Sequence, residues 1–200
     1  MKLYISPGAC SMASNIALRE AGIPFEMSKV DKRTKRADGV DFVTINPKGY
    51  VPALRLDDGQ VLTENVAVLQ YIADLNPAAK LAPPAGTMER YRLQEWLSFI
   101  NSEVHKAFTP LFSSEVTDET KTYARNYLAK RLTYLDTALG DNKYLMGDQF
   151  TVADAYLFTV LGWGAHVGVD IGPKLKSYVE RIRARPQVIE AMTAEGLIKK

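Results

Sequence analysis

The sequence predicts a two-part fold, in which a small mixed α/β domain is followed by an all-helical domain. Over the first 75 residues, short β-prone runs alternate with helical patterns, whereas the chain after residue 87 carries helical patterns alone. The stretch between them is rich in proline, alanine and glycine, which is typical of a linker. We expect the α/β domain at residues 1–77, the linker at 78–86 and the helical domain at 87–200.

The composition is that of an ordinary soluble globular protein, with 46% hydrophobic and 24% charged residues. A formal net charge of +2 without a basic arm gives no sign of a nucleic-acid partner. No apolar run approaches the roughly 20 residues that cross a bilayer, so no membrane partner is expected. The N-terminal apolar run ends at Pro7-Gly8, too early for the core of a signal peptide. We therefore expect a cytoplasmic protein.

Cysteine and histidine are scarce in this chain. Cys10 is the single cysteine, which excludes an internal disulfide, a Cys-x-x-Cys redox pair and a thiolate-rich zinc site. It also fits a reducing compartment. The two histidines, His105 and His166, give no basis for a catalytic metal, and no metal is expected.

The first third of the chain begins with a β-α-β pattern. Residues 3–5 are a β-prone run, and a helix is expected over 11–21, with Gly22 as its stop. A second strand is expected over 25–30. The charged stretch 31–41 reads as a loop.

A β-β-α pattern follows. Strands are expected at 53–56 and 60–62, joined by a hairpin turn at Asp58-Gly59. Thr63 is expected to N-cap the next helix. The order predicts a mixed four-stranded sheet covered by helices, which is the order of the thioredoxin fold.

Helical periodicity dominates the second half. The stretch 152–161 is apolar nearly all round, so it is expected to be the buried central helix. Thr151 and Asp154 predict a capping box at its start, which is a structural role. The apolar stripes of the other helices are Leu93, Leu97, Ile100 and Val104, and Leu128, Leu132, Leu135 and Leu139.

Cys10 follows the first strand and stands at the start of the first helix. Backbone N–H groups and the positive end of the helix dipole favour a thiolate there, either of the protein or of a ligand. The alternative is a small buried cysteine without a chemical role. Ser11 either N-caps the helix or donates to a bound sulfur.

Three further segments are candidates for binding. In a thioredoxin-like order, Val51-Pro52 is expected to be cis, so that Val51 pairs with an extended peptide; the alternative is an ordinary trans proline. The helix start at Glu64-Asn65 suits an amino-acid-like group, or simply carries a stabilising acid. Pro110 is expected to kink the helix near Lys106 and aim His105 into a cleft. The alternative is a structural histidine.

Taken together, these segments resemble the cytosolic glutathione transferases, specifically the bacterial Beta class, over essentially the whole chain. Any one segment is modest support, but the joint order and spacing are specific. The matching segments in the first half are residues 1–4, 6–11, 18–20, 46–49, 51–54 and 62–64. Those in the second half are residues 95–97, 105–106, 108–112 and 150–156.

The resemblance implies glutathione as cosubstrate, a small hydrophobic electrophile and a homodimer. Cys10 would lie close to the glutathione sulfur and form a mixed disulfide with it, and Cys10 and His105 are the implied catalytic residues. Lys35 and His105 are the implied contacts near the glycine carboxylate of glutathione, and Glu64 and Asn65 those at its γ-glutamyl end. Val51, ahead of cis Pro52, would pair with the cysteinyl part. The other implied contacts are Cys10, Ser11, Ser98, Ser102, Glu103 and Val104. The implied wall of the electrophile pocket comprises Ala9, Phe108, Trp163 and His166.

This chain departs from the family pattern at three positions. Ile5 stands where an aromatic residue is common, Tyr50 where glutamine is common, and Asn65 where a small residue is common. Three functions remain open on these grounds. The first is conjugation of glutathione to hydrophobic electrophiles, and the second is thiol transferase or peroxidase chemistry through Cys10. The third is a non-catalytic module that binds apolar ligands or a partner protein.

Overall fold

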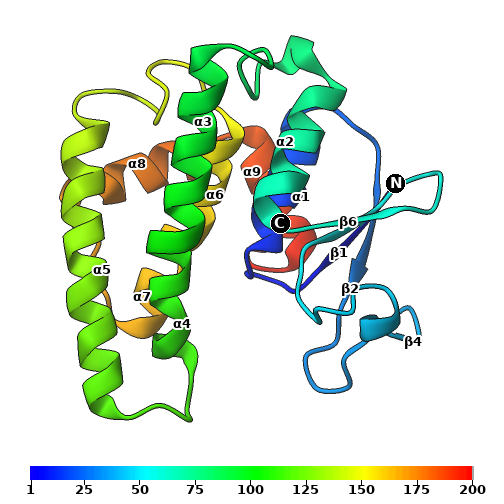
Figure 1. The fold of residues 1–200 in the computed structure, drawn as a ribbon, viewed down its shortest axis with the longest axis horizontal. Coiled ribbons are helices and arrows are strands. Elements are labelled where there is room, and N and C mark those ends of the chain that lie inside the picture. Colours follow the sequence, from blue (N-terminus) through cyan, green and yellow to red (C-terminus); the bar gives the residue numbers. More distant parts are fainter. Residues whose placement is uncertain (200) are drawn as a thin grey trace. The chain divides into compact units, whose positions relative to one another are not determined.

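The computed structural model describes residues 1–199, which form two compact units. One unit comprises residues 1–82 together with the chain from Ala184 onward, and the other comprises Pro83–Arg183. The ribbon in Figure 1 shows strands only in the first unit. The predicted fold class, a thioredoxin-like part and an all-helical part, is confirmed.

The first unit is built on a mixed four-stranded sheet. Its strands are β1 (Lys2–Ile5), β2 (Glu26–Lys29), β5 (Ala53–Arg55) and β6 (Val61–Thr63), in the order β2-β1-β5-β6. The β1–β2 pair is parallel, and the β1–β5 and β5–β6 pairs are antiparallel. This is the mixed sheet that the β-α-β and β-β-α patterns predict.

Three α-helices belong to the described part of this unit. They are α1 (Ser11–Glu20), α2 (Asn65–Leu75) and α9 (Pro186–Glu195). Helix α1 packs against both α2 and α9, as Figure 1 also shows. The compact units follow packing, so the segment containing α9 groups with the sheet although it comes after the helical unit in the sequence. The division into domains at residues 77 and 87 stays a prediction.

The side chains on the two faces of β1 belong to different parts of the core. Because side chains alternate along a strand, Leu3 and Ile5 share one face and Tyr4 lies on the other. Tyr4 packs in a buried cluster, with its ring centroid 5.8 Å from that of Phe42. The stretch 31–41 is therefore not a bare loop: it contains the paired strands β3 (Arg36–Ala37) and β4 (Val40–Asp41), followed by the 3₁₀ turn η1 (Phe42–Thr44). A second 3₁₀ turn, η2, covers Pro77–Ala79.

The helical unit contains the apolar stripes that the sequence predicts. Its elements are α3 (Met88–Phe99), η3 (Ile100–His105), α4 (Lys106–Phe112), α5 (Asp118–Leu139), α6 (Val152–Leu161), α7 (Gly164–Val167) and α8 (Pro173–Arg183). All eight stripe residues on α3, η3 and α5 are buried. Within residues 1–199, no helix has the length and apolarity that a membrane crossing requires.

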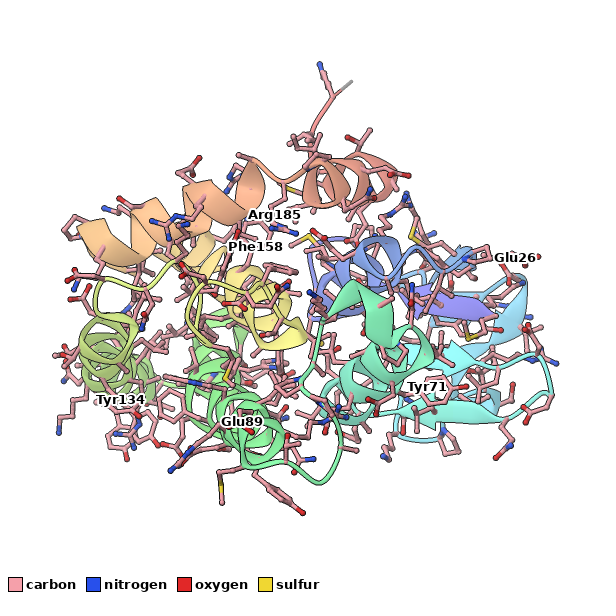
Figure 2. The ribbon with its side chains drawn as sticks, turned by 90° about the horizontal axis from the view of Figure 1, so that it is seen from above. Glu26, Tyr71, Glu89, Tyr134, Phe158 and Arg185 are labelled. Atoms are coloured by element: carbon pink, nitrogen blue, oxygen red, sulfur yellow. The ribbon has the colours of Figure 1, made fainter. Side chains whose placement is uncertain are left out.

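Helix α6 is the buried centre of this unit, as predicted. Each of its residues is buried, including Phe158, which Figure 2 labels. The predicted capping box between Thr151 and Asp154 is present. Asp154 also accepts hydrogen bonds from the backbone N–H of Leu145 and the hydroxyl of Tyr178, so one buried carboxyl joins three segments.

The helix geometry differs from expectation near His105. Pro110 lies inside α4, and the departure from α-helical geometry comes earlier, in the π-helical turn η3 that ends at His105. Such π-helical turns occur frequently at functional sites. His105 is the last residue of this turn, and the kink caused by Pro110 stays a prediction.

Candidate active site

Cys10 occupies the N-cap position of α1 and is partly exposed. Its Sγ donates a hydrogen bond to the backbone carbonyl of Val51 at 3.1 Å. The residues at the start of a helix point their N–H groups outward, so this position favours negative charge on a nearby sulfur. The structure thus brings together Cys10 and Val51, two residues that lie 41 positions apart in the sequence.

The loop before Cys10 is braced from within. The buried Ser11 hydroxyl accepts from the Ser6 N–H at 3.1 Å and donates to the Ser6 carbonyl at 3.3 Å. Ser11 is the first residue of α1, so the alternative in which it N-caps this helix is wrong. Its contact with a bound sulfur stays a prediction.

A second brace comes from α9. The Glu195 carboxylate accepts from the Gly8 N–H at 2.8 Å and from the Asn15 side-chain amide at 3.0 Å. Glu195 is only 3% exposed. Burial raises the pKa of Glu195, and the hydrogen bonds from Asn15 and Gly8 oppose that rise. The carboxylate therefore fixes the turn that leads into Cys10 without facing solvent.

The Val51-Pro52 peptide bond is cis, as the thioredoxin-like order predicts. Pro52 is buried and directly precedes β5. Val51 is partly buried against the cluster of Tyr4 and Phe42. Ala9, a predicted wall residue, lies in the adjacent loop, where its N–H bonds to the Ser6 carbonyl at 2.9 Å.

The start of α2 carries a strained residue. Glu64, rather than Thr63, occupies the N-cap position, so the predicted cap is wrong. Its φ of 68° lies in a region that non-glycine residues adopt rarely and at a cost of about 1–3 kcal/mol. Lys48 donates to the exposed Glu64 carboxylate at 2.7 Å. Strain of this kind, held by the surrounding structure, is characteristic of binding sites.

Asn65 connects this helix start to Cys10. Its side-chain amide donates to the Cys10 carbonyl at 3.2 Å, and its Oδ1 accepts from the Ser14 hydroxyl at 2.8 Å. The structure therefore groups Cys10, Val51, Glu64 and Asn65 around the start of α1. Lys35 is exposed in the segment before β3, with a φ of 56°, and its role in binding stays a prediction.

In the helical unit, His105 is held by polar and aromatic contacts. Its Nδ1 lies 2.6 Å from the Tyr156 hydroxyl, which in turn donates to Asn101 at 3.0 Å. The Trp163 ring packs edge-on against the His105 ring, with centroids 4.8 Å apart. Burial, with a smaller contribution from the charge of Lys106, lowers the pKa of His105 to about 4. The imidazole is therefore neutral at neutral pH.

Trp163 is the centre of an aromatic cluster. The centroids of Phe108 and Phe112 lie 5.7 and 5.8 Å from that of Trp163, both edge-on. The structure thus brings together two of the predicted wall residues and adds Phe112, whose ring is exposed. His166 lies on α7 and is exposed.

The remaining predicted glutathione contacts differ in accessibility. Ser98 and Ser102 are exposed one turn apart, and Ser102 donates to the Ser98 carbonyl at 3.0 Å. The Val104 side chain is fully buried in the helical core. Glu103 accepts from Arg131 at 2.8 Å and from the Tyr127 hydroxyl, and these bonds lower its pKa. Glu103 therefore links η3 to α5 through these hydrogen bonds.

Sequence reasoning missed several members of this arrangement. Lys48 and Tyr156 belong to segments that match the family pattern, but the pattern alone gives neither residue a partner. Glu195 gives no signal because its partners are distant in sequence. Among residues 1–199, no group of three or more acidic, cysteine or histidine side chains is arranged to hold a metal ion.

Comparison with known families defines the class of protein to which this fold and site belong. The family described as glutathione S-transferase, N-terminal domain, matches residues 8–75, and the C-terminal domain family matches residues 99–186. The chain belongs to the glutathione S-transferase family, so the predicted resemblance is confirmed.

Bacterial members are among its similar relatives. The chain is 46% identical over 200 residues to glutathione S-transferase GstA of Escherichia coli O157:H7, covering 98% of this chain and all of that protein. It is 38% identical to glutathione S-transferase GST-4.5 of Xanthomonas campestris, covering 98% of this chain and all of that protein.

Solved structures agree with this assignment. A beta class glutathione S-transferase of Sphingomonas chungbukensis superposes with a TM-score of 0.95 at 54% identity, covering 99% of this chain and all of that one. A sphingomonad glutathione S-transferase in complex with glutathione gives 0.95 at 51% identity, with the same coverage.

Proposed function

We propose that this enzyme conjugates the glutathione thiolate to small hydrophobic electrophiles. The observation that carries the proposal is the group of Cys10, Val51, Glu64 and Asn65 at the start of α1, in a member of the glutathione S-transferase family. The relative whose structure was solved with glutathione covers 99% of this chain. Detoxification of reactive compounds is the corresponding biological role.

In this proposal, the thioredoxin-like unit holds glutathione by its backbone and its charges. The Val51 backbone pairs with the cysteinyl part, and the exposed carboxylate of Glu64 binds the ammonium of the γ-glutamyl end. The N–H groups at the start of α2 suit the carboxylate of the same end. Lys35 then binds the glycine carboxylate. Ser11 holds the loop before Cys10, beside which the glutathione sulfur binds.

The chemistry of conjugation needs a thiolate next to an electrophilic carbon. The start of α1 favours the thiolate over the thiol, and the thiolate is the nucleophile. Its sulfur forms a bond to the carbon, and the leaving group, such as chloride from an aryl chloride, departs with the bonding electrons. Alignment of the two reactants supplies much of the rate increase. The aromatic cluster of Phe108, Phe112 and Trp163 offers apolar surface for the electrophile.

A second activity is favoured by the partial exposure of the single cysteine at a helix start. The Cys10 thiolate would attack a glutathione mixed disulfide, forming a Cys10–glutathione disulfide and releasing the other thiol. A second glutathione thiolate would then attack that disulfide, releasing oxidised glutathione and restoring Cys10. The atoms and electrons balance with glutathione as the reductant.

One experiment separates these activities. Wild type and Cys10→Ala are assayed for aryl-halide conjugation and for mixed-disulfide reduction. We expect Cys10→Ala to lose disulfide reduction and to retain conjugation. Loss of both activities with intact glutathione binding would make Cys10 the conjugation catalyst. A wild type that neither binds glutathione nor performs either reaction would overturn the proposal.

A mass measurement tests the disulfide directly. After incubation with oxidised glutathione, intact mass is expected to show one glutathionyl adduct on the wild type. Because Cys10 is the only cysteine, Cys10→Ala is the matched control and is expected to show none. A wild type that stays unmodified would remove the thiol transferase activity from the proposal.

The assembly and location belong to the same proposal. A cytoplasmic homodimer is implied by the family resemblance, with Ser98, Ser102 and Glu103 among the residues that reach glutathione, some of them from the second subunit. Sedimentation of the purified protein tests the dimer. A monomer at micromolar concentration that still conjugates glutathione would contradict it.

A further inference from the structure

His105 has two polar neighbours, Tyr156 and Asn101, that join it in one hydrogen-bonded chain. His105 ends the π-helical turn η3, and its Nδ1 lies 2.6 Å from the hydroxyl of Tyr156, a fully buried residue of α6. The same hydroxyl lies 3.0 Å from Oδ1 of Asn101, one turn before His105. A hydroxyl, an imidazole and an amide therefore form a chain of two hydrogen bonds.

The number of protons in this chain fixes the direction of both bonds. The Tyr156 hydroxyl carries one proton, and Oδ1 of Asn101 can only accept. Tyr156 therefore donates to Asn101, so the bond at 2.6 Å needs its proton from His105. Nδ1 is then the protonated nitrogen of a neutral ring, and Nε2 carries a lone pair.

The His105 ring is neutral at neutral pH. Burial lowers the pKa of His105 to about 4, with the charge of Lys106 acting in the same direction. A cationic ring that would donate from Nε2 as well is therefore a minor species at neutral pH. Edge-on packing by Trp163 and Tyr156 holds the plane of the ring.

We propose that Tyr156 and Asn101 are positioning residues, which hold His105 as the Nδ1–H tautomer so that Nε2 meets the ligand as a hydrogen-bond acceptor. The partner of His105 is then a donor group, an amide N–H or a thiol S–H before the thiol ionises, and not a carboxylate. This inference rests on the proposed function, and it revises one expectation of the family resemblance, which placed His105 near the glycine carboxylate. An acceptor nitrogen and a carboxylate repel each other, so Lys35 alone remains for that end.

Nitrogen NMR of the imidazole tests the tautomer without any ligand. The chain has two histidines, so His166→Gln assigns the signals of His105. We expect Nδ1 of His105 to show the shift of a protonated ring nitrogen and Nε2 that of an unprotonated one. The reverse pattern would overturn the proposal.

Two substitutions at one position give a matched pair. In Asn101→Ala, the Tyr156 hydroxyl loses its acceptor and is expected to donate to Nδ1, which moves the His105 proton to Nε2. In Asn101→Asp, a carboxylate oxygen accepts in place of the amide oxygen, so the wild-type tautomer is expected to persist. A purely structural role for Asn101 would leave the tautomer unchanged in both variants.

Glutathione binding provides the functional measurement. Asn101→Ala is expected to raise KM for glutathione about tenfold, the factor for one lost hydrogen bond, whereas Asn101→Asp stays near wild type. S-methylglutathione has no thiol to react, so its dissociation constant is measured instead of KM. An effect of Asn101→Ala that disappears with this ligand identifies the thiol as the donor, and an effect that persists identifies an amide. Equal KM values in all three proteins, with the tautomer shifted, would overturn the link to the ligand. If the wild type binds no glutathione, the proposed function fails while the tautomer result stands.

Discussion

Asp154 is the residue whose removal tests the architecture of the helical unit most directly. Its buried carboxyl accepts from the Leu145 N–H at 2.8 Å, the Thr151 N–H at 2.8 Å and the Tyr178 hydroxyl at 2.7 Å. The Thr151 hydroxyl adds a fourth bond at 2.9 Å. Asp154→Ala leaves these donors in the core beside a small cavity.

The magnitude follows from the donors that lose their acceptor. Each buried donor without a partner costs about 1–3 kcal/mol, so the four donors set an upper range of about 4–12 kcal/mol. Burial raises the pKa of Asp154, which shows that burying its charge is unfavourable. Asp154→Ala removes this unfavourable energy, so the net loss of stability is smaller than the sum over the donors. We expect a loss of about 3–5 kcal/mol in the free energy of unfolding.

Urea denaturation followed by far-ultraviolet circular dichroism provides the assay. Asp118→Ala is the matched control, because Asp118 is an exposed acid in the first turn of α5 and its loss should cost less than about 1 kcal/mol. If Asp154→Ala lost less than about 1.5 kcal/mol at an unchanged denaturant slope, the reasoning from unsatisfied donors would be refuted.

Three further predictions concern the thioredoxin-like unit. The pKa of Glu195 is raised in the folded state, so its contribution to stability is present below its ordinary pKa and lost as pH rises through the raised value. In urea titrations, the stability difference between wild type and Glu195→Gln should therefore fall as pH rises above about 4, and a constant difference would contradict this. Arg185→Ala breaks a two-bond ion pair with Glu20, at 2.6 and 2.8 Å, and should lower the free energy of unfolding by about 2 kcal/mol. Glu64→Gln should weaken glutathione binding about tenfold in calorimetry and change stability by less than about 1 kcal/mol, because the Lys48–Glu64 pair is exposed; unchanged affinity would remove Glu64 from the site.

Periodicity explains why much of the fold could be predicted. The stripes on α3 and α5 and the all-apolar α6 follow from helical spacing, and the sheet order follows from the sequence of strand and helix patterns. Cys10 could be placed at a helix start because Pro7-Gly8 ends the first strand. These features depend on neighbours within a few residues, which a single sequence displays.

The missed features depend on distant or unusual contacts. Thr63 is the better N-cap residue by type, yet the helix starts after Glu64, whose positive φ no local rule predicts. Tyr156 reads as a core aromatic residue on a buried helix, and only the folded chain brings its hydroxyl to His105. Arg185, labelled in Figure 2 just before α9, likewise finds Glu20 far along the sequence.

The bond between Glu195 and Gly8 also sets a temporal order for synthesis. The two residues lie 187 positions apart, so a growing chain has displayed Cys10 and its loop long before the carboxylate that braces them exists. Until α9 emerges and packs on α1, the loop of the nascent protein lacks the Glu195 brace and depends on its bonds within the first 82 residues, such as those of Ser11 and Asn65. Completion of the thiol site is thereby coupled to the synthesis of α9, and a ribosome stalled before α9 carries a cysteine that has not yet acquired its native surroundings.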